Sequence, residues 1–455
     1  MAVWSQTVLS SIENSWGRLD AEYYKPEFLE TENLLSKIDG VKLRNSCCKI
    51  DVGHVGPMVR FYSDNGIILL QTQNVREFFL DLQHCIKITP DFHKNLTKSQ
   101  VQKGDILIAR SGSFGTAAIY LEDQIINSAD IIIVELNDPK IDPLFAVTFM
   151  NTKYGFNQLI RFASGGVQGH INLRILENLF LPTLAFNLQK EISTNVQRAY
   201  DALKVSAESY QQAQHLLESE LGLDKLKFKK PVGYTVRFGD IYKSGRFDAD
   251  YYQPQFDAIS QIVNNYHNGY KPLIYLATPL KPNTDPSKIP NQLYNYIELS
   301  NINPNFGTVD GFESMLGKDL PSRARRQVKH GDVIASSVVG SADKVAVIDS
   351  NRSGFIASTG FFHFRPVNVS PEYLLILVSS KCVRMQFQQQ STGGILSAVP
   401  DNRLKNVIVP NLPELLQREI ANLVIQSHKA KRESEKLLNQ AKTRVEQLIE
   451  EAAEQ

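Results

Sequence analysis

The sequence is poor in cysteine, nearly neutral in net charge, and without a long apolar run. Its four cysteines, Cys47, Cys48, Cys85 and Cys382, lack the paired spacing of a zinc site or a disulfide framework, so we expect reduced thiols in a cytosolic protein. Lys and Arg number 49 against 48 Asp and Glu. Binding to nucleic acid would therefore depend on local basic patches. No signal-peptide pattern or 18-residue apolar window appears, which predicts a cytoplasmic protein that neither is secreted nor spans a membrane.

What the sequence does contain is an internal repeat. Residues 18–28 read RLDAEYYKPEF and residues 246–256 read RFDADYYQPQF, with seven of eleven positions identical. The same offset of 228 relates Gly165-Gly166 to Gly393-Gly394. Two such units account for essentially all 455 residues. The chain is therefore a duplicated module. The segments between the shared positions differ, as expected of two modules that recognise different targets.

Each copy is predicted to be a mixed α/β domain with a twisted, mainly antiparallel sheet, which places the chain in the α+β class. Short apolar runs bounded by Gly and Asp indicate strands at 67–70, 106–109, 130–134, 333–335 and 345–348. The proposed domains are residues 1–186 and 231–411. Residues 187–230 form a long helix with a linker, and residues 412–455 form a second long helix.

Both long segments carry apolar or small residues at alternating steps of four and three, the pattern of a heptad seam. The two seams are Ile192, Val196, Ala199, Leu203, Ser206, Tyr210, Ala213 and Leu217, then Ile420, Val424, Ser427, Lys431, Ser434, Leu438, Ala441, Val445 and Leu448. A helix of about 35 residues is about 50 Å long, longer than a small domain is wide. We expect the helices to pair as an antiparallel coiled coil, although amphipathic helices more often simply cover a core. Gly222 should end the first helix.

Basic residues precede a Gly-Asp turn in both copies and are candidates for contact with phosphates. The turns are Gly104-Asp105 and Gly331-Asp332. The proposed contacts are Lys98, Lys103, Arg323, Arg325, Arg326 and Lys329. A solvated charged face is the alternative interpretation.

Polar loops near these turns are candidates for reading base edges. The Arg110 guanidinium could bond a guanine edge, and side-chain amides could bond an adenine edge. The structural alternatives are a salt bridge for Arg110 and capping of turns for the amides. The first copy offers Gln71, Gln73, Asn74, Arg76, Arg110, Ser111, Ser113, Gln168 and His170. The second copy offers Asn301, Asn303, Ser336 and Ser337.

Taken together, the repeated R-x-D-A-x-Y-Y segment, the Gly-Asp turn before a loop, the later glycine pair and the Q-[KR]-E-I helix entry resemble the specificity subunits of type I restriction-modification systems. The resemblance covers the whole chain and rests on the duplicated order of these motifs. It implies that each module is a target-recognition domain for one half of a split double-stranded DNA site, with the paired helices setting the unread spacer.

The resemblance also implies partners. Two methyltransferase (modification) subunits and restriction or translocase subunits would assemble on the chain, whereas the chain itself would carry no catalytic site, metal or cofactor. S-adenosylmethionine, ATP and magnesium are expected on the partner subunits only.

Three rival functions deserve comparison. Asn303-Pro304-Asn305-Phe306 approximates the motif with which a DNA adenine methyltransferase holds a flipped base, but it lacks the second proline and a donor-binding glycine loop. Asp285-Pro286-Ser287-Lys288 would be a weak nuclease candidate. A purely structural coiled-coil adaptor would explain the helices but not two diverged polar modules.

Overall fold

The computed structural model describes residues 5–7, 12, 19–83, 85–112, 114–163, 171–226, 228, 233–393 and 397–454. The chain divides into two compact units. Unit 1 comprises Met1–Ala202 with Arg432–Gln455, and unit 2 comprises Leu203–Lys431. Each unit therefore contains one sheet-bearing domain and half of each long helix.

The repeat found in the sequence is present in the topology of the larger sheets. In unit 1 the order is β2 (Cys47–Val52), β10 (Ile131–Leu136), β7 (Ile106–Ala109), β8 (Ala117–Ile119) and β4 (Phe78–Phe79). In unit 2 it is β13 (Ala277–Pro279), β22 (Phe361–Pro366), β19 (Val333–Ser336) and β20 (Val345–Val347). The first four strands follow each other in the same order. Every residue of β7 and β19 is buried, because these strands lie inside their sheets.

A second sheet repeats as well. Its order is β5 (Ile86–Ile88), β3 (Tyr62–Leu70), β9 (Ile126–Ser128) and β6 (Gln100–Val101) in unit 1. In unit 2 it is β17 (Glu313–Leu316), β14 (Leu293–Ile297), β21 (Ile356–Ser358) and β18 (Ala324–Gln327). The central pair is parallel in both sheets and its neighbours are antiparallel. The mainly antiparallel character is as predicted, but each unit has two such sheets and not one.

Small elements complete the units. Two-stranded pairs join β1 (Gly40–Lys42) to β11 (Phe180–Pro182) and β12 (Tyr270–Pro272) to β23 (Ile408–Pro410), and β15 (Ile302–Asn303) pairs with β16 (Thr308–Val309). The shorter helices are α2 (Pro26–Leu35), α3 (Pro90–Asn95), α4 (Pro143–Met150), α5 (Lys153–Ala163), α6 (Leu173–Leu176), α8 (Phe238–Ser244), α9 (Pro254–Asn264), α10 (Pro371–Ser379) and α11 (Lys381–Gln390). Pro26 and Pro254 begin α2 and α9, where a missing N–H costs nothing.

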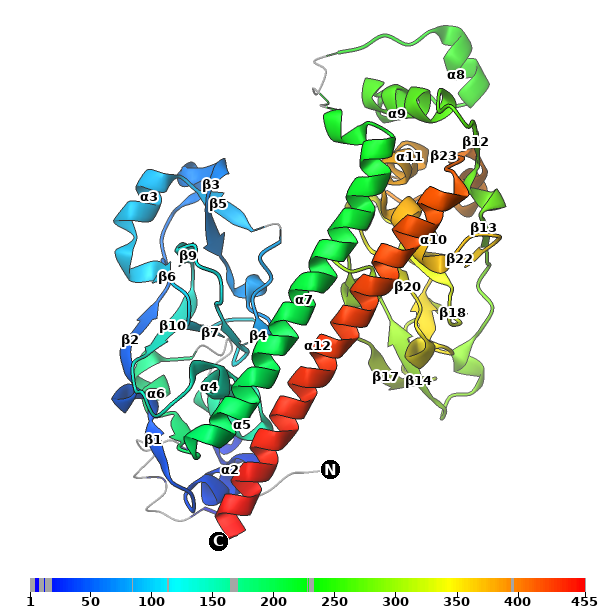
Figure 1. Cartoon of the computed structure of the whole chain (residues 1–455). Helices are drawn as coiled ribbons and strands as arrows, with labels where there is room; N and C mark the ends of the chain where they lie inside the picture. Colours follow the sequence, from blue (N-terminus) through cyan, green and yellow to red (C-terminus); the bar gives the residue numbers. More distant parts are fainter. Residues whose placement is uncertain are drawn as a thin grey trace. The chain divides into compact units, whose positions relative to one another are not determined.

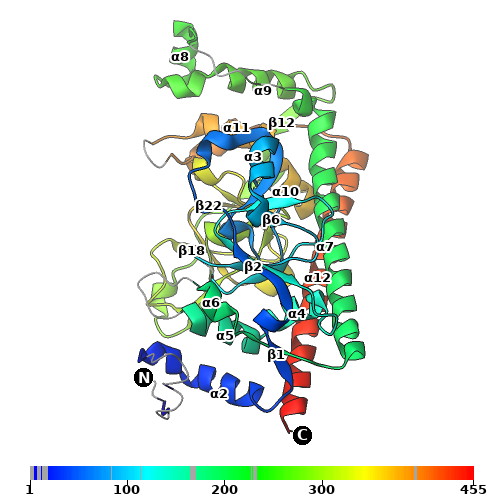
Figure 2. The same ribbon diagram turned by 90° about the vertical axis from the view of Figure 1, so that its left-hand side faces the viewer.

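The two long helices are α7 (Phe186–Glu220) and α12 (Glu414–Glu454), which lie side by side (Figure 1 and Figure 2). Gly222 follows α7 with φ 65°, the left-handed conformation that ends a helix. The modular boundaries at 186, 230 and 411 stay predictions, since the compact units divide the chain within the helices.

The contacts in unit 2 confirm the antiparallel pairing. In unit 2, Ser206 and Ser427 are buried and their hydroxyl oxygens lie 3.1 Å apart. Further along, Ala213 shares a core with Ile420, so residue numbers rise on α7 as they fall on α12. In unit 1 the seam residues Ile192, Val196, Ala199, Ser434, Ala441 and Val445 are buried. Leu203, Lys431 and Leu438 are half-buried.

Candidate nucleic-acid interface

In unit 2, three polar segments that are distant in the sequence meet where β19 ends and β22 begins. Ser337 donates its N–H and its hydroxyl to the carbonyl oxygen of Gly360, both at 2.9 Å. Val399 donates its N–H to the Ser337 carbonyl at 2.9 Å, and Val338 forms a β-bridge with Ala398. We call residues 336–341, 358–361, 391–393 and 397–399 the polar loop end of unit 2.

Unit 1 has an equivalent surface built on the same strands. Arg110 Nη1 lies 3.0 Å from Asp130 Oδ1, and Ser111 donates its hydroxyl to Asp130 Oδ2 at 3.1 Å. Thr72 donates its hydroxyl to the Asp130 carbonyl at 3.3 Å. Asp130 has φ 53°, a left-handed conformation that is strained for most residues and tolerated by Asp and Asn. Residues 71–74, 110–112 and 128–131 are the polar loop end of unit 1.

The strand registers show how the two loop ends correspond. Ala109 pairs with Ile131 in unit 1, and Ser336 pairs with Phe361 in unit 2. The next position on each strand is therefore Arg110 or Ser337, opposite Asp130 or Gly360. The same scaffold presents a half-buried ion pair in one unit and two small neutral residues in the other.

The predicted amide readers at the start of this surface are engaged in turns. Asn74 is buried, its Oδ1 accepts the N–H of Gln71 at 2.8 Å, and its Nδ2 donates to the Asp81 carbonyl at 3.1 Å. Asn301 caps the equivalent turn by accepting the N–H of Glu298 at 2.8 Å. Gln73 is exposed and donates to the half-buried Gln71 side chain at 3.2 Å. The geometry therefore gives both asparagines a capping role.

Asn303 lies in a hairpin that packs on α12. Its Nδ2 donates to Asp310 at 2.6 Å, and Lys431 Nζ of α12 lies 3.0 Å from the same carboxylate. His428 Nε2 lies 2.7 Å from the Phe306 carbonyl oxygen. The segment considered above as a methyltransferase motif is thus the turn of β15–β16, held against a helix.

In unit 1, the segment that follows the turn capped by Asn74 contacts the long helices in a similar way. Lys442 Nζ of α12 lies 2.6 Å from Glu77, and the Phe79 ring is 5.1 Å from that of Tyr200 in α7. Tyr200 and His428 are related by the repeat offset of 228. The loop after each capped turn therefore attaches a domain to the helix pair.

Three other predicted contacts are engaged by groups within unit 2. Arg326 is buried, donates to the Leu280 carbonyl at 2.5 Å, and lies 3.9 Å from Asp401. Arg325 pairs with Asp285, and its guanidinium, together with the Ser287 hydroxyl, lowers the pKa of that carboxyl to about 2. Ser336 is buried, with its hydroxyl 2.9 Å from that of Ser341. Asp285, considered above as part of a nuclease site, thus forms an ion pair with Arg325.

The remaining basic candidates are exposed: Arg76, Lys98, Lys103, Arg323 and Lys329. Lys103 pairs with Asp123 at 2.7 Å on the surface. Arg323 flanks the polar loop end of unit 2, because its carbonyl accepts the N–H of Thr359 at 2.8 Å. Ser113, Gln168 and His170 lie outside the described residues.

The repeated Gly-Asp turns are structural. Gly104 and Gly331 have φ 96° and 82°, and the following aspartates accept the backbone N–H three residues earlier, each at 2.9 Å. Burial raises the pKa of Asp105 to about 6. Burial also acts on Asp332, but His363 Nε2 at 2.6 Å and Arg365 Nε at 3.0 Å outweigh it and hold its pKa below the usual value. One motif thus has two electrostatic environments.

Sequence reasoning missed Asp130, Gly360 and residues 397–399. A charged residue between the apolar runs 125–126 and 131–134 was the only local signal for Asp130. The described residues contain no group of three or more His, Cys, Asp or Glu arranged to hold a metal ion, and the four cysteines are free. No described helix is long and apolar enough to cross a membrane.

Comparison with known proteins supports the resemblance. Residues 43–214 match the model of the type I restriction modification DNA specificity domain. A stretch of 137 residues, 30% of this chain, is 26% identical to the type I restriction enzyme EcoBI specificity subunit of Escherichia coli. That stretch spans 29% of the curated relative.

Solved structures that align with this chain include the type I restriction-modification S subunit from M. genitalium. The alignment has 11% sequence identity and a TM-score of 0.43, and it covers 91% of this chain and 95% of that one. The HsdS subunit from Thermoanaerobacter tengcongensis gives 14% identity and a TM-score of 0.27, covering 90% and 96%.

Proposed function

We propose that the chain reads a two-part DNA target, one half-site with each unit, as the match of residues 43–214 to the type I restriction modification DNA specificity domain suggests. The observation that carries the proposal is the pair of polar loop ends. They stand at the same strand positions in both units and differ in chemistry at Arg110/Ser337 and Asp130/Gly360.

The chemistry at each loop end suits a different kind of contact. Arg110 can present a fork of donors to a guanine edge, and Asp130 can hold that fork or accept from cytosine, worth about 1–3 kcal/mol of discrimination for a good bidentate pair. Ser337 and Gly360 leave room for a base edge to approach the backbone. We therefore infer that the half-sites differ in sequence.

The helix pair supports a second part of the proposal. Antiparallel α7 and α12 would separate the half-sites and set the unread spacer. They would also receive two methyltransferase subunits and the restriction or translocase subunits. S-adenosylmethionine, ATP and magnesium would reside on those partners. With a net charge of +1 the chain alone has little general attraction for phosphates, so we expect weak DNA binding until the partners join.

A non-catalytic role is part of this proposal. The turn containing Asn303 is engaged by Asp310, and the neighbouring Phe306 carbonyl by His428, which disfavours a base-flipping methyltransferase site at that place. We expect no methyl transfer to DNA by the isolated chain, and transfer once a modification subunit is added. Transfer by the chain alone would contradict this part.

The target is tested by mapping methylated bases in a host that carries the chain and its modification subunit. A double variant, Arg110→Ser with Asp130→Gly, gives unit 1 the side chains of unit 2 at these positions. We expect the recognised sequence to change in one half-site only. Lys37→Gln, an exposed change at the end of α2, is the control and should change neither. A change in both half-sites, or in none, would count against independent reading by the loop ends.

A further inference from the structure

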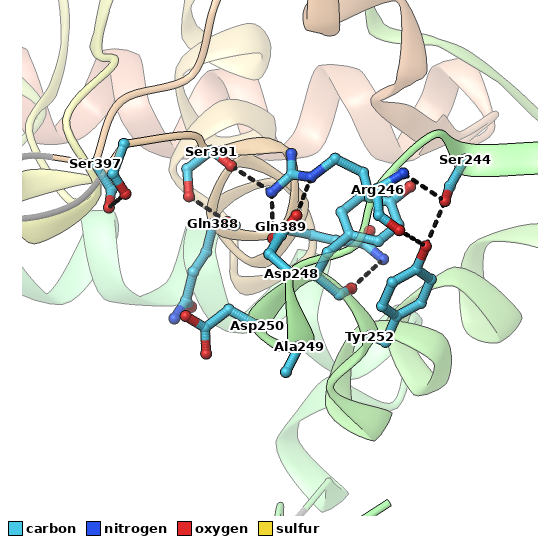
Figure 3. Close-up of polar contacts among 12 residues, drawn as sticks. Ser244, Arg246, Asp248, Ala249, Asp250, Tyr252, Gln388, Gln389, Ser391 and Ser397 are labelled. Atoms are coloured by element: carbon cyan, nitrogen blue, oxygen red, sulfur yellow. Dashed lines mark hydrogen bonds and ion pairs between the residues drawn. The ribbon is translucent and has the colours of Figure 1, made fainter. Parts of the chain in front are cut away.

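The most similar segment of the two repeats lies at the entry to each domain and is described in full in unit 2. Arg246 there is 9% exposed. Its Nε and Nη2 each lie 2.5 Å from one oxygen of Asp248, a bidentate pair (Figure 3). Tyr252 donates its hydroxyl to the Arg246 carbonyl at 2.6 Å and also bonds Ser244. A planar, bidentate pair of this kind has few alternative geometries.

The pair reaches across to the end of α11. Arg246 Nη2 also donates to the Ser391 carbonyl at 2.9 Å (Figure 3), and its guanidinium carbon lies 4.9 Å from the Tyr251 ring centroid. Gln389 donates to the Tyr251 carbonyl at 3.3 Å. Two bonds thus tie the motif to the last residues before the glycine pair.

Those residues open onto the polar loop end. Thr392 and Ala398 exchange backbone hydrogen bonds at 2.9 and 3.0 Å, and Gly393 between them has φ 114°, which side-chain-bearing residues rarely adopt. Ala398 bridges to Val338, next to Ser337. Arg246 is therefore bonded to Ser391, and the next residue, Thr392, is bonded to Ala398 on the surface proposed to meet DNA.

Unit 1 makes the corresponding tie with a different side chain. Arg161 of α5 lies 228 positions before Gln389 and donates to the Tyr23 carbonyl at 2.9 Å, with its guanidinium carbon 4.1 Å from the Tyr23 ring centroid. The same helix end is fastened to the same tyrosine of the motif. The contact to this carbonyl is therefore common to both copies, although the side chain that makes it differs.

We propose that the Arg246–Asp248 pair is a positioning element that fixes residues 391–393 and 397–399 and thereby the half-site reading of unit 2, without touching DNA itself. The inference rests on the proposed function and deepens it. The alternative is that the pair only stabilises the domain. The two roles predict different effects when the pair is removed. Loss of a positioning element changes the loop and the reading of one half-site, whereas loss of a stabilising pair weakens the domain core.

The test compares Arg246→Ala with Asp250→Asn, an exposed change in the same motif. In the full-length chain we expect amide exchange in residues 391–393 and 397–399 to accelerate by about tenfold or more, as the loss of one charge-assisted hydrogen bond implies. Exchange in β19 should stay unchanged, and Asp250→Asn should change neither. Unaltered exchange in residues 391–393 and 397–399, or equal acceleration in β19, overturns the proposal.

The second arm uses the chain with its modification subunit. Methylation rates are compared on targets with one base changed in either half. We expect Arg246→Ala to reduce discrimination about tenfold in the half-site of unit 2 and to leave the other half unchanged. Faster loop exchange with intact discrimination would overturn the positioning role. If the wild-type complex methylates no two-part site, the proposed function fails, and that outcome is recognised before any variant is made.

Discussion

Substituting asparagine for the two Gly-Asp aspartates should change stability in opposite directions. Asp105 is buried with its pKa raised to about 6, and Lys49 and Glu135 are the nearest charges that act on it. Holding this carboxylate ionised at pH 8 opposes folding by up to about 3 kcal/mol, since one pKa unit corresponds to about 1.4 kcal/mol. Asparagine can still accept the Gln102 N–H. We expect Asp105→Asn to stabilise unit 1 by about 1–2 kcal/mol, after the cost of burying an amide.

Asp332 is the matched case with the opposite sign. Its carboxylate receives Arg365 and lies against His363, whose side chain is 0% exposed. Asp332→Asn removes the charge from a buried network and leaves one acceptor oxygen for Arg365, His363 and the Lys329 N–H, which share two oxygens of the carboxylate. Breaking a buried pair in this way typically costs about 3–5 kcal/mol, and the exposed side of Arg365 favours the lower end. We expect unit 2 to lose about 3 kcal/mol.

The pH dependence follows from the two directions. Because the pKa of Asp105 is higher in the folded state than in the unfolded chain, unit 1 binds a proton more tightly when folded. Its stability should fall as pH rises from about 4 to about 6 and then level off. The lowered pKa of Asp332 gives stability to unit 2 above the unfolded pKa, and this is lost as pH falls through the folded pKa. Each slope should disappear in the corresponding asparagine variant.

Hydrogen exchange read by mass spectrometry suits this test, because peptides from β7–β8 and β19–β20 report the two units separately within one chain. The expected result is slower exchange in β7 for Asp105→Asn and faster exchange in β19 for Asp332→Asn. Loss of protection in both variants would refute the electrostatic reasoning and leave the turn hydrogen bond as the dominant contribution.

Two further perturbations test the helix contacts. Ser206→Ala leaves the buried Ser427 hydroxyl without its partner and should lower the local stability by about 1 kcal/mol, measured by hydrogen exchange in the adjoining helix peptides. The double variant Ser206→Ala with Ser427→Ala should recover most of this stability. Strictly additive losses would contradict an interaction between the two serines. Asp310→Asn removes the ion pair with Lys431 and should accelerate exchange in residues 302–310 at pH 7. Burial opposes ionisation of Asp310, but Lys431, Thr308 and Asn303 outweigh burial and lower the pKa of this carboxyl. The wild-type hairpin should therefore loosen only as pH falls below about 4. A difference from the variant that does not depend on pH would contradict this explanation.

The features that the sequence predicted well are periodic or repeated. The heptad seams depend on spacing within one helix, and the duplication depends on an offset, so both can be read locally. The roles of Asn74 and Asn303 could not be read in this way. An amide next to a turn is equally suited to adenine or to a backbone N–H, and only the fold shows that Asn74 is buried and that Asn303 faces Asp310. Asp130 was missed because its partners Arg110 and Thr72 come from other loops.

The distribution of shared and diverged residues suggests how such a chain can change one half-site at a time. Core positions tolerate exchange: Ile133 and His363 occupy equivalent places in β10 and β22, paired with Leu107 and Ile334 in the same register. The loop ends are free to differ, as Arg110 and Ser337 do. What stays common is the fastening of each helix end to the entry motif. A new specificity therefore requires new side chains at the loop end of one unit, while the fastening and the helix pair keep that loop end in place.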